Sequence, residues 1–333
     1  MKTIKVGIIG AGGNARGHGK RLRALPNVQI AALADPSDGS IARFAEAVFP
    51  EGNVPSRYTK HQEMLAAEPL DAVMISSPHT LHFGQIMDAL DKSLHVLVEK
   101  PMVCSSEEAE QVIAKARETD RHVVVSYQRR FGARYRFMKE FIHKPEFGAR
   151  YYFSAFLSQG WLKAQTGKWR QDPALSGGGQ LNDSGSHIID MLTWLLEDPM
   201  QTVSALIDNR GTRVDVDSAI TFKTKGGTMG TLTILGSGPT KVFWEDMTIA
   251  GETGCSLFMR KGNLMATHGH GEALVSVDDT NGHKETSPDA HFIDVITGKA
   301  QNESPPEAFL EVIRFTEACW QSAEQGGRPI AVG

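Results

Sequence analysis

A glycine-rich hexapeptide near the start of the chain, Gly10-Ala11-Gly12-Gly13-Asn14-Ala15, follows the apolar run 4–9 and precedes a segment of helical period. It fits the pattern G-x-G-x-x-A, whose first glycine permits a tight turn and whose second lets backbone amides approach a pyrophosphate. The N-terminus of the following helix would stabilise that negative charge. Glycines in such a turn can also be simple steric relief, but the flanking strand-like and helical patterns favour dinucleotide binding.

An acidic residue, Asp35, ends the second apolar run and stands 25 residues after Gly10. A carboxylate there can accept hydrogen bonds from the adenosine ribose hydroxyls and would repel a 2′-phosphate. Because a proline follows it, Asp35 could instead be an ordinary turn residue. We favour the ribose role and hence NAD over NADP, although Arg16 and Arg43 could meet a phosphate and reverse that preference.

A lysine stands at another strand end, because Glu99-Lys100-Pro101 closes the apolar run Val96-Leu97-Val98. Such a run is typical of a buried strand in a parallel sheet, and ligands of these sheets bind beyond the carboxyl ends of the strands. Lys100 is therefore predicted to face the nicotinamide.

The motif D-x-x-x-H occurs at Asp183 and His187. Four residues on a helix bring two side chains to one face, so both could contact one substrate hydroxyl. A hydride leaves a secondary alcohol only as its proton is removed, and histidine is well matched to that proton at neutral pH. The structural alternative is that Asp183 caps a helix starting at Ser184 and that His187 faces the core. Spacing alone does not decide between them.

Two more histidines follow the apolar run that ends at Ile75, in Ser76-Ser77-Pro78-His79 and at His82. Either could line the nicotinamide pocket, since this strand end belongs to the same edge of the sheet. His79 is equally suited to cap the next helix, and His82 to be a satisfied residue within it. No metal site is predicted.

The elements that must position these residues alternate along the first part of the chain. Apolar runs at 4–9, 28–34, 72–75, 96–98 and 123–125 are separated by segments of helical period. This alternation predicts a doubly wound parallel sheet of the Rossmann type over residues 1–126.

After residue 126 the pattern changes to longer strand-like segments, with glycine-containing turns at 226–227 and 236–238 and a few helical segments between them. The predicted strands lie near 151–157, 203–208, 218–222, 229–235 and 247–250. Residues 127–333 are therefore predicted to form an α+β domain with a mainly antiparallel sheet. Helices are expected at 135–142, 186–196, 290–297 and 306–325, and a flexible glycine loop at 176–179.

Length and composition narrow the classes of function. A chain of 333 residues suits two domains with a cleft between them. Its 35 Lys and Arg against 39 Asp and Glu give a net charge of −4, which favours a small-molecule partner over nucleic acid or an anionic membrane. Three scattered cysteines and an N-terminus without a long apolar segment predict a cytoplasmic protein with reduced thiols.

Taken together, these residues resemble the Gfo/Idh/MocA oxidoreductase family over nearly the whole chain. Five stretches carry the resemblance: Gly10-Ala11-Gly12-Gly13, Glu99-Lys100-Pro101, Tyr127-Gln128-Arg129-Arg130-Phe131, the segment from Gly177 to Asp190, and the segment from Ser322 to Ile330.

The resemblance implies a role for each catalytic candidate. Lys100 would orient and polarise the substrate hydroxyl, Asp183 would position the substrate and the histidine, and His187 would be the general acid/base. Family members often carry asparagine where this chain has His79, so the contact from that loop is expected to differ. An open-faced sheet used for dimer or tetramer contacts is also implied.

Substrate contacts are expected from aromatic and basic residues around the glycine loop, because a sugar or cyclitol offers C–H faces and hydroxyls. A core role is the alternative for one of the tryptophans. The expected substrate-binding residues are Lys100, Arg129, Trp161, Trp169, Arg170, Asp183 and His187. The expected cofactor-binding residues are Gly10, Gly12, Gly13, Asn14, Ala15, Asp35, Ser76, Pro78, His79, His82, Glu99, Lys100 and Gln128.

Three hypotheses for the function follow. The first is an NAD-dependent dehydrogenase acting on a secondary hydroxyl of a sugar, sugar derivative or inositol. The second is an NADP-dependent reductase of a keto sugar or another carbonyl. The third is a non-catalytic regulator that binds a dinucleotide, and the presence of all three catalytic candidates argues against it.

Overall fold

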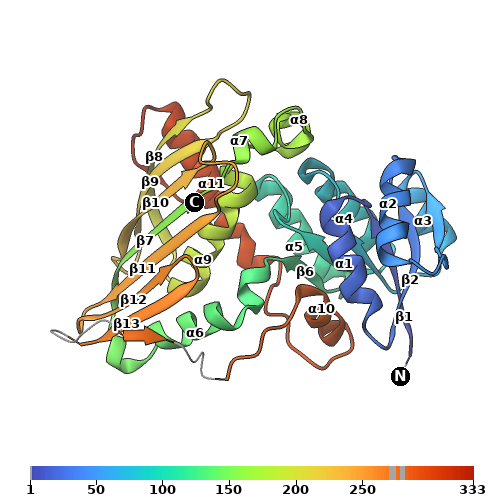
Figure 1. Ribbon diagram of the computed structural model, residues 1–333, viewed down its shortest axis with the longest axis horizontal. Helices are drawn as coiled ribbons and strands as arrows, with labels where there is room; N and C mark the ends of the chain where they lie inside the picture. Colours follow the sequence, from blue (N-terminus) through green and yellow to red (C-terminus); the bar gives the residue numbers. More distant parts are fainter. Residues whose placement is uncertain (1, 270–274, 278–281) are drawn as a thin grey trace. The chain divides into compact units, whose positions relative to one another are not determined.

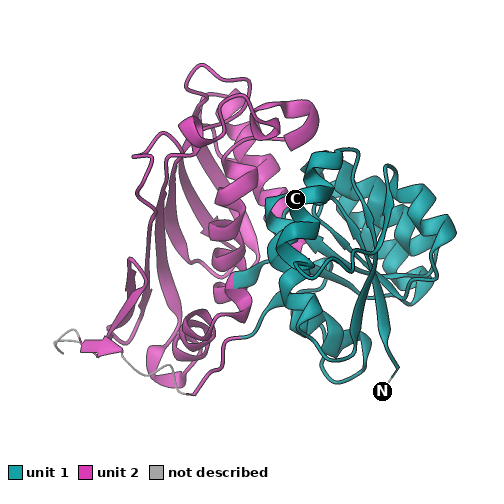
Figure 2. Ribbon diagram, turned by 45° about the vertical axis from the view of Figure 1, so that its right-hand side comes forward, with its two compact units in different colours: residues 1–128, 286–307 teal, residues 129–285, 308–333 magenta. Residues whose placement is uncertain are grey.

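The computed structural model describes residues 2–269, 275–277 and 282–333 and forms two compact units (Figure 2). The first unit consists of the described residues up to Gln128 together with Thr286–Glu307. The second consists of the described residues of Arg129–Glu285 together with Ala308–Gly333.

The first unit is built on six described parallel strands in the order β3-β2-β1-β4-β5-β6 (Figure 1). The inner strand β4 is apolar and buried throughout, and its neighbours β1 and β5 are mostly so, as expected where both faces of a sheet are covered. The predicted doubly wound sheet is confirmed. The strands are β1 Ile4–Ile9, β2 Val28–Ala34, β3 Ser56–Tyr58, β4 Ala72–Ile75, β5 His95–Glu99 and β6 Val123–Ser126. The helices are α1 Gly13–Arg23, α2 Asp38–Val48, α3 His61–Ala67, α4 His82–Asp91, α5 Ser106–Thr119 and α10 Pro288–Ile296, with a 3₁₀ turn at His79–Leu81.

The segment 286–307 differs from the sequence prediction, which placed all residues after 126 in the second domain. Its helix α10 buries Phe292 and Ile293 in the same core as Leu97 and Val124 of the first sheet. Burial of these large apolar side chains therefore decides where the segment packs, despite its place late in the chain. The division between the units also falls after Gln128 rather than after residue 126.

The second unit contains a sheet with nine described strands in the order β14-β13-β12-β11-β7-β10-β9-β8-β15. Only the β7–β10 pair is parallel among these described strands, so the predicted mainly antiparallel sheet is confirmed. The strands are β7 Arg150–Ser158, β8 Met200–Asp208, β9 Asp217–Thr224, β10 Met229–Leu235, β11 Trp244–Gly251, β12 Cys255–Arg260, β13 Asn263–His268, β14 Val275–Val277 and β15 Ile330–Ala331.

Helices cover one face of this sheet (Figure 1). Phe315 of α11, for example, packs edge-on against Phe222 of β9 with ring centroids 6.3 Å apart. Strands β9 and β10 alternate buried and exposed residues, as is typical of a sheet with one face on the core. No helix among the described residues covers the second face (Figure 1). The helices are α6 Ala133–Ile142, α7 Trp161–Ala164, α8 Pro173–Ser176, α9 Ser186–Leu196 and α11 Glu307–Glu324. Shorter helical turns are Gln128–Phe131, Pro145–Phe147, Trp169–Gln171 and the π turn Leu181–Gly185.

Candidate active site

The predicted cofactor residues of the first unit gather at the carboxyl ends of the parallel strands. The strand order reverses direction between β1 and β4, and ligands of open α/β sheets bind at such a switch point. The residues at these ends are Gly10–Ala15 after β1, Asp35 after β2, Ser76–His79 after β4, Glu99 and Lys100 at the end of β5, and Gln128 after β6.

In the glycine-rich hexapeptide, Gly10 and Gly12 are required for different physical reasons. Gly10 has a φ of +86°, and a Cβ there would lie 2.6 Å from the Ser76 carbonyl oxygen. A Cβ on Gly12 would meet nothing within 4 Å. The fold therefore requires Gly10, whereas Gly12 keeps open a space that the protein itself does not fill.

The helix beyond Gly12 has the features of an anion site. Gly12 is the N-cap of α1 and supplies no side-chain cap, and the first turn contains no acidic residue. The amides of this turn and the positive end of the helix dipole are thus available to a pyrophosphate. Together with the open space at Gly12, this arrangement fits a dinucleotide.

The Asp35 side chain connects the loop after β1 to the loop after β2. Its Oδ2 accepts a hydrogen bond from the Ala11 amide at 2.7 Å, and its Oδ1 accepts one from the Ser37 amide at 2.8 Å. A carboxylate oxygen can accept more than one hydrogen bond, so both remain competent to receive a ribose hydroxyl.

Replacing Gly12 by Ala is expected to weaken NAD binding at least about tenfold with little effect on stability, because the added methyl occupies the space of the pyrophosphate. Isothermal titration with NAD and urea unfolding measure the two effects. Gly84→Ala is the matched control, since Gly84 in α4 also has nothing within 4 Å of a built Cβ. A Gly12→Ala protein that binds NAD as tightly as the wild type would contradict this placement of the cofactor.

Lys100 follows β5 directly and is 8% exposed. Its backbone N–H donates to Glu99 Oε2 at 3.2 Å. The carbonyl oxygen of the next residue, Pro101, lies 2.9 Å from Nδ1 of His82. The main chain on both sides of Lys100 is therefore anchored by side chains.

His82 is fully buried, and its predicted cofactor contact is not supported. Its second ring nitrogen, Nε2, lies 3.1 Å from the Ser77 carbonyl oxygen. Because carbonyl oxygens only accept hydrogen bonds and a neutral imidazole carries one N–H, His82 donates to one of these two carbonyls and is in contact with the other. Burial lowers the pKa of His82 below its usual range. His82 thus ties the loop after β4 to the loop after β5, which is the structural alternative considered for it. His79 is also buried, within the 3₁₀ turn.

Asp183 lies in the π turn Leu181–Gly185, where the Gly185 amide donates to the Gln180 carbonyl at 2.8 Å. The turn continues into α9, which carries His187 in its first turn. Asp183 makes no cap, so the capping alternative is wrong. Its side chain and that of His187 are one helical turn apart, and both are buried. Single π turns within helices are frequent at functional sites.

Four predicted substrate residues form one cluster in the second unit. Oδ2 of Asp183 accepts the indole N–H of Trp161 at 2.8 Å and pairs with Nε of Arg170 at 2.9 Å. The Arg170 guanidinium lies 4.3 Å from the centroid of the Trp169 ring. Trp161 is buried, so its role is to hold Asp183, whereas Trp169 and Arg170 are partly exposed.

Trp161→Phe is expected to lower kcat by about tenfold, because it keeps the ring but removes a hydrogen bond to a buried carboxylate worth about 1.5–3 kcal/mol. Steady-state kinetics and NAD titration measure the effect. Trp169→Phe is the comparison, since that indole is held by stacking on Arg170. Unchanged kcat in Trp161→Phe would show that Asp183 does not depend on this donor.

The glycine loop before Asp183 is fixed, although the sequence predicted a flexible one. A Cβ on Gly179 would lie 2.0 Å from the Asp215 carbonyl oxygen, and one on Gly178 would lie 2.6 Å from the Trp320 ring. The Asp215 carboxylate accepts the amides of Gly179 and Leu181 at 2.9 and 2.6 Å and the Trp320 indole N–H at 3.0 Å. Burial raises the pKa of Asp215 above its usual range. Sequence reasoning missed this residue, whose only signal is an acidic side chain between two valines.

Arg129, predicted to contact substrate, forms an ion pair with the buried Glu245. The other oxygen of Glu245 accepts the Tyr135 hydroxyl at 2.8 Å. Burial, together with the Glu245 charge, raises the pKa of Tyr135 to about 12. The sequence predicted a substrate contact for Arg129 but not this ion pair with Glu245. Gln128 beside it is exposed.

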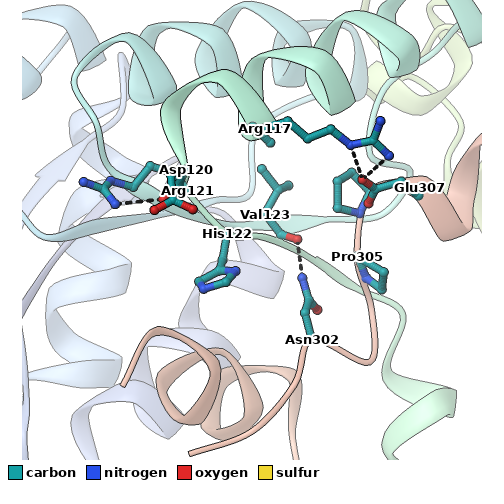
Figure 3. Close-up of a pocket in the computed structure, with 10 residues that line it drawn as sticks. Arg117, Asp120, Arg121, His122, Val123, Asn302, Pro305 and Glu307 are labelled. Atoms are coloured by element: carbon teal, nitrogen blue, oxygen red, sulfur yellow. Dashed lines mark hydrogen bonds and ion pairs between the residues drawn. The ribbon is translucent and has the colours of Figure 1, made fainter. Parts of the chain in front are cut away.

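A pocket of about 240 Å³ lies between the end of α5, the start of β6 and the segment 302–307 (Figure 3). The start of β6 belongs to the edge of the sheet opposite the cofactor residues. Arg117 donates to Glu307 at 3.1 Å and Arg121 donates to the Ser93 carbonyl at 2.7 Å, so both cations are engaged. None of the predicted site residues lines this pocket.

Among the residues that the structure describes, no group of three or more His, Cys, Asp or Glu is arranged to hold a metal ion. Within the same residues, no helix combines the length and apolar character needed to cross a membrane.

Two models of known protein families match this chain. Residues 4–127 match the model of an oxidoreductase family with an NAD-binding Rossmann fold, and residues 135–256 match the C-terminal domain of the same family. The chain belongs to the Gfo/Idh/MocA oxidoreductase family. Its first unit is accordingly an NAD-binding Rossmann domain, which confirms the predicted cofactor.

Relatives in the Gfo/Idh/MocA family are distant. An uncharacterized oxidoreductase of Schizosaccharomyces pombe is 31% identical over 212 residues, which cover 63% of this chain and 56% of the relative. Glucose-6-phosphate 3-dehydrogenase of Bacillus subtilis is 28% identical over 202 residues, covering 60% and 56%. The chain thus spans a little over half the length of these curated relatives. A WlbA dehydrogenase structure from Bordetella pertussis, in complex with NADH and UDP-GlcNAcA, shares the fold with a TM-score of 0.83 at 20% identity, covering 100% of this chain and 99% of that one.

Proposed function

We propose that this protein is an NAD-dependent dehydrogenase that moves a hydride between NAD and a secondary hydroxyl or carbonyl carbon of a sugar, sugar derivative or inositol. The observation that carries the proposal is the buried Asp183, held by Trp161 and Arg170 one helical turn before His187, in a chain whose Rossmann domain presents Lys100 at a strand end. A non-catalytic dinucleotide-binding protein would not need this arrangement.

The proposed chemistry assigns one task to each residue. When bound beside Lys100, NAD would supply the acceptor for the hydride that leaves the substrate carbon. His187 takes the hydroxyl proton as general base, because an imidazole exchanges protons readily at neutral pH. The Lys100 ammonium orients that hydroxyl and stabilises negative charge developing on its oxygen. The Asp183 carboxylate, fixed by Trp161 and Arg170, orients the substrate and the imidazole. In the reverse direction the same residues return the proton to the carbonyl oxygen.

The sugar class is supported by the chemistry of the partly exposed pair Trp169 and Arg170. An indole face suits the C–H groups of a ring, and a guanidinium donates to hydroxyls. A relative named glucose-6-phosphate 3-dehydrogenase supports the same class.

NAD is proposed over NADP because Asp35 places a carboxylate after β2, where a 2′-phosphate would be repelled. The alternative function, an NADP-dependent carbonyl reductase, requires the opposite preference. Separate titrations with NADH and NADPH distinguish them, and we expect NADH to bind at least about tenfold more tightly, a difference of about 1.4 kcal/mol.

The experiment for the function is a screen of inositols, sugars and sugar acids with NAD and NADP, following reduced cofactor by absorbance. Lys100→Met protein prepared in parallel controls for contaminating dehydrogenases. The proposal expects turnover of at least one polyol by the wild type alone. Tight NAD binding without turnover on any alcohol or carbonyl would overturn it and favour the dinucleotide-binding regulator.

We further propose a homodimer or homotetramer formed through the uncovered face of the second sheet. Leu206 and Met229 on this face are 64% and 58% exposed, and burying such large apolar side chains against a second copy would remove apolar surface from water. Light scattering of the wild type is expected to give a dimer or tetramer, and of Leu206→Lys/Met229→Lys a smaller species. A monomeric wild type would contradict the proposal.

A further inference from the structure

A buried histidine that the proposed chemistry does not use, His18 of α1, lies between two carboxylates of the first unit. Its Nδ1 is 2.7 Å from Asp289 Oδ1, and its Nε2 is 2.8 Å from Glu99 Oε1. The side chains of His18 and Asp289 are 2% and 0% exposed. Two acidic residues far apart in the chain therefore meet on one imidazole ring.

The geometry requires His18 to donate from both nitrogens, because ionised carboxylates only accept hydrogen bonds. Burial alone would lower the pKa of His18, but hydrogen bonds to Asp289 and Glu99 and the charges of these two groups raise it to about 9. Burial opposes ionisation of Glu99 too, yet the hydrogen bond and charge of His18 lower its pKa below the usual range. His18 is thus an imidazolium near neutral pH.

The charges around this ring alternate in sign. Arg21 lies behind Asp289, with its Nε 2.5 Å from Oδ2. Besides His18, the side chains of Lys100 and His82 also act electrostatically on the Glu99 carboxylate. Because His18 balances Glu99 and the partly exposed Arg21 balances Asp289, each carboxylate has a cationic partner, as burial of a charge requires.

Glu99 connects this array to Lys100. Its Oε1 accepts from His18, while its Oε2 accepts the Lys100 backbone N–H at 3.2 Å. On the other side, Asp289 stands in the first turn of α10, whose start is fixed by Ser287 Oγ accepting the Ala290 amide at 3.1 Å. The imidazolium therefore joins a rigid helix start to the carboxylate that holds the lysine backbone.

We propose that His18 is a positioning residue for Lys100, acting as a doubly hydrogen-bonded imidazolium that orients Glu99 and thereby the main chain at the end of β5. The role of Lys100 in turnover rests on the proposed function, but the hydrogen-bonded array does not. Asp289 belongs to the segment 286–307, which returns to the first unit. Through Asp289 and His18, this segment then helps to position Lys100.

The test compares His18→Gln and Asp289→Asn with His291→Gln. Glutamine at position 18 cannot donate to both carboxylates in this geometry, and Asp289→Asn removes one negative partner while keeping the shape. His291 is the matched control, because it is a buried histidine of the same segment whose Nε2 accepts the Glu303 amide at 3.0 Å.

Two readouts keep this test separate from the test of function. NMR spectra of ¹⁵N-histidine-labelled protein should show one imidazole with both nitrogens protonated at neutral pH, titrating at about 9. Its signal should vanish in His18→Gln, and its midpoint should fall by about one pH unit or more in Asp289→Asn. In ¹⁵N-lysine-labelled protein, the Lys100 amide, identified by its absence from the spectrum of Lys100→Arg, should move in His18→Gln and Asp289→Asn and not in His291→Gln.

With a substrate found in the screen, His18→Gln should lower kcat at least about tenfold while the Kd for NAD stays within about threefold, because its contacts lead to Lys100 and not to the pyrophosphate loop. An imidazole that titrates below about 7, or a Lys100 amide unmoved in His18→Gln and Asp289→Asn, would overturn the proposal whether or not the protein shows turnover. Absent turnover with the NMR results as expected would overturn only the proposed function.

Discussion

Lys100→Met and His187→Gln are each expected to reduce kcat by about 10³-fold, because positioned proton-transfer and charge-stabilising groups contribute roughly 10²–10⁴-fold each. Methionine keeps the length of the lysine stem but removes its charge, and glutamine keeps much of the imidazole's size but cannot take a proton. The Kd for NAD should change by less than about threefold, since neither residue belongs to the glycine-rich loop. Steady-state kinetics at saturating NAD and isothermal titration give the two values.

Lys92→Met serves as the control for this experiment, because Lys92 is an exposed lysine that follows α4 in the same unit as Lys100. It should retain wild-type kinetics. A kcat within about threefold of wild type in either Lys100→Met or His187→Gln would remove that residue from the catalytic chemistry.

Stability is expected to depend on pH through His18. Its pKa of about 9 in the folded protein exceeds the ordinary value of 6.5, so the folded state binds this proton more tightly than the unfolded chain. The stabilising contribution is therefore complete below pH 6.5, declines between 6.5 and about 9, and is lost above that. At 1.36 kcal/mol per pH unit, the contribution is about 3 kcal/mol.

The difference in unfolding midpoint between wild type and His18→Gln isolates this effect, because other titrating groups are common to both proteins. Urea unfolding followed by circular dichroism should show the difference shrinking as pH rises from about 6.5 to 9.5. His95, whose pKa burial lowers to about 4, titrates below this range in the folded state. A stability difference that stays constant across the range would contradict a charged His18.

The strands of the first unit were predictable because residues buried on both faces give continuous apolar runs, as at Val123–Ser126. The short β3 Ser56–Tyr58 escaped prediction because its three residues are exposed or half-buried and carry no such run. In the second unit, β12 and β13 were missed although buried residues alternate with partly buried or exposed ones on both sides of the turn at Lys261. A periodicity of only six residues is a weak signal beside the longer strands.

The candidate site was predictable wherever a residue's position in the chain also decides its place in the fold. Lys100 and Asp35 are of this kind, because a strand end in a parallel sheet has a fixed location. The buried array was not, since His18 and Asp289 are 271 residues apart. Helical period places a histidine at position 18 on the apolar face of its helix with Ala15 and Leu22, but it cannot name the carboxylates that meet the ring.

For Asp183, the sequence could not distinguish a place on the helix face of His187 from a helix cap. Its spacing from His187 indicated a shared helix face, yet the same spacing allowed an N-cap. The choice depends on a π turn and on donors from Trp161 and Arg170, which lie 22 and 13 residues earlier in the chain. Such a turn has no sequence pattern of its own, so only the folded structure distinguishes the two interpretations.

A double-mutant cycle between Lys100 and His187 tests most directly whether both residues act on one substrate hydroxyl. If both residues act on the same substrate hydroxyl, the Lys100→Met/His187→Gln enzyme should lose about as much kcat as the poorer single variant, roughly 10³- to 10⁴-fold, because groups that act as a unit are strongly non-additive. Losses that multiply to about 10⁶-fold would show that the two residues act independently, and would contradict the account.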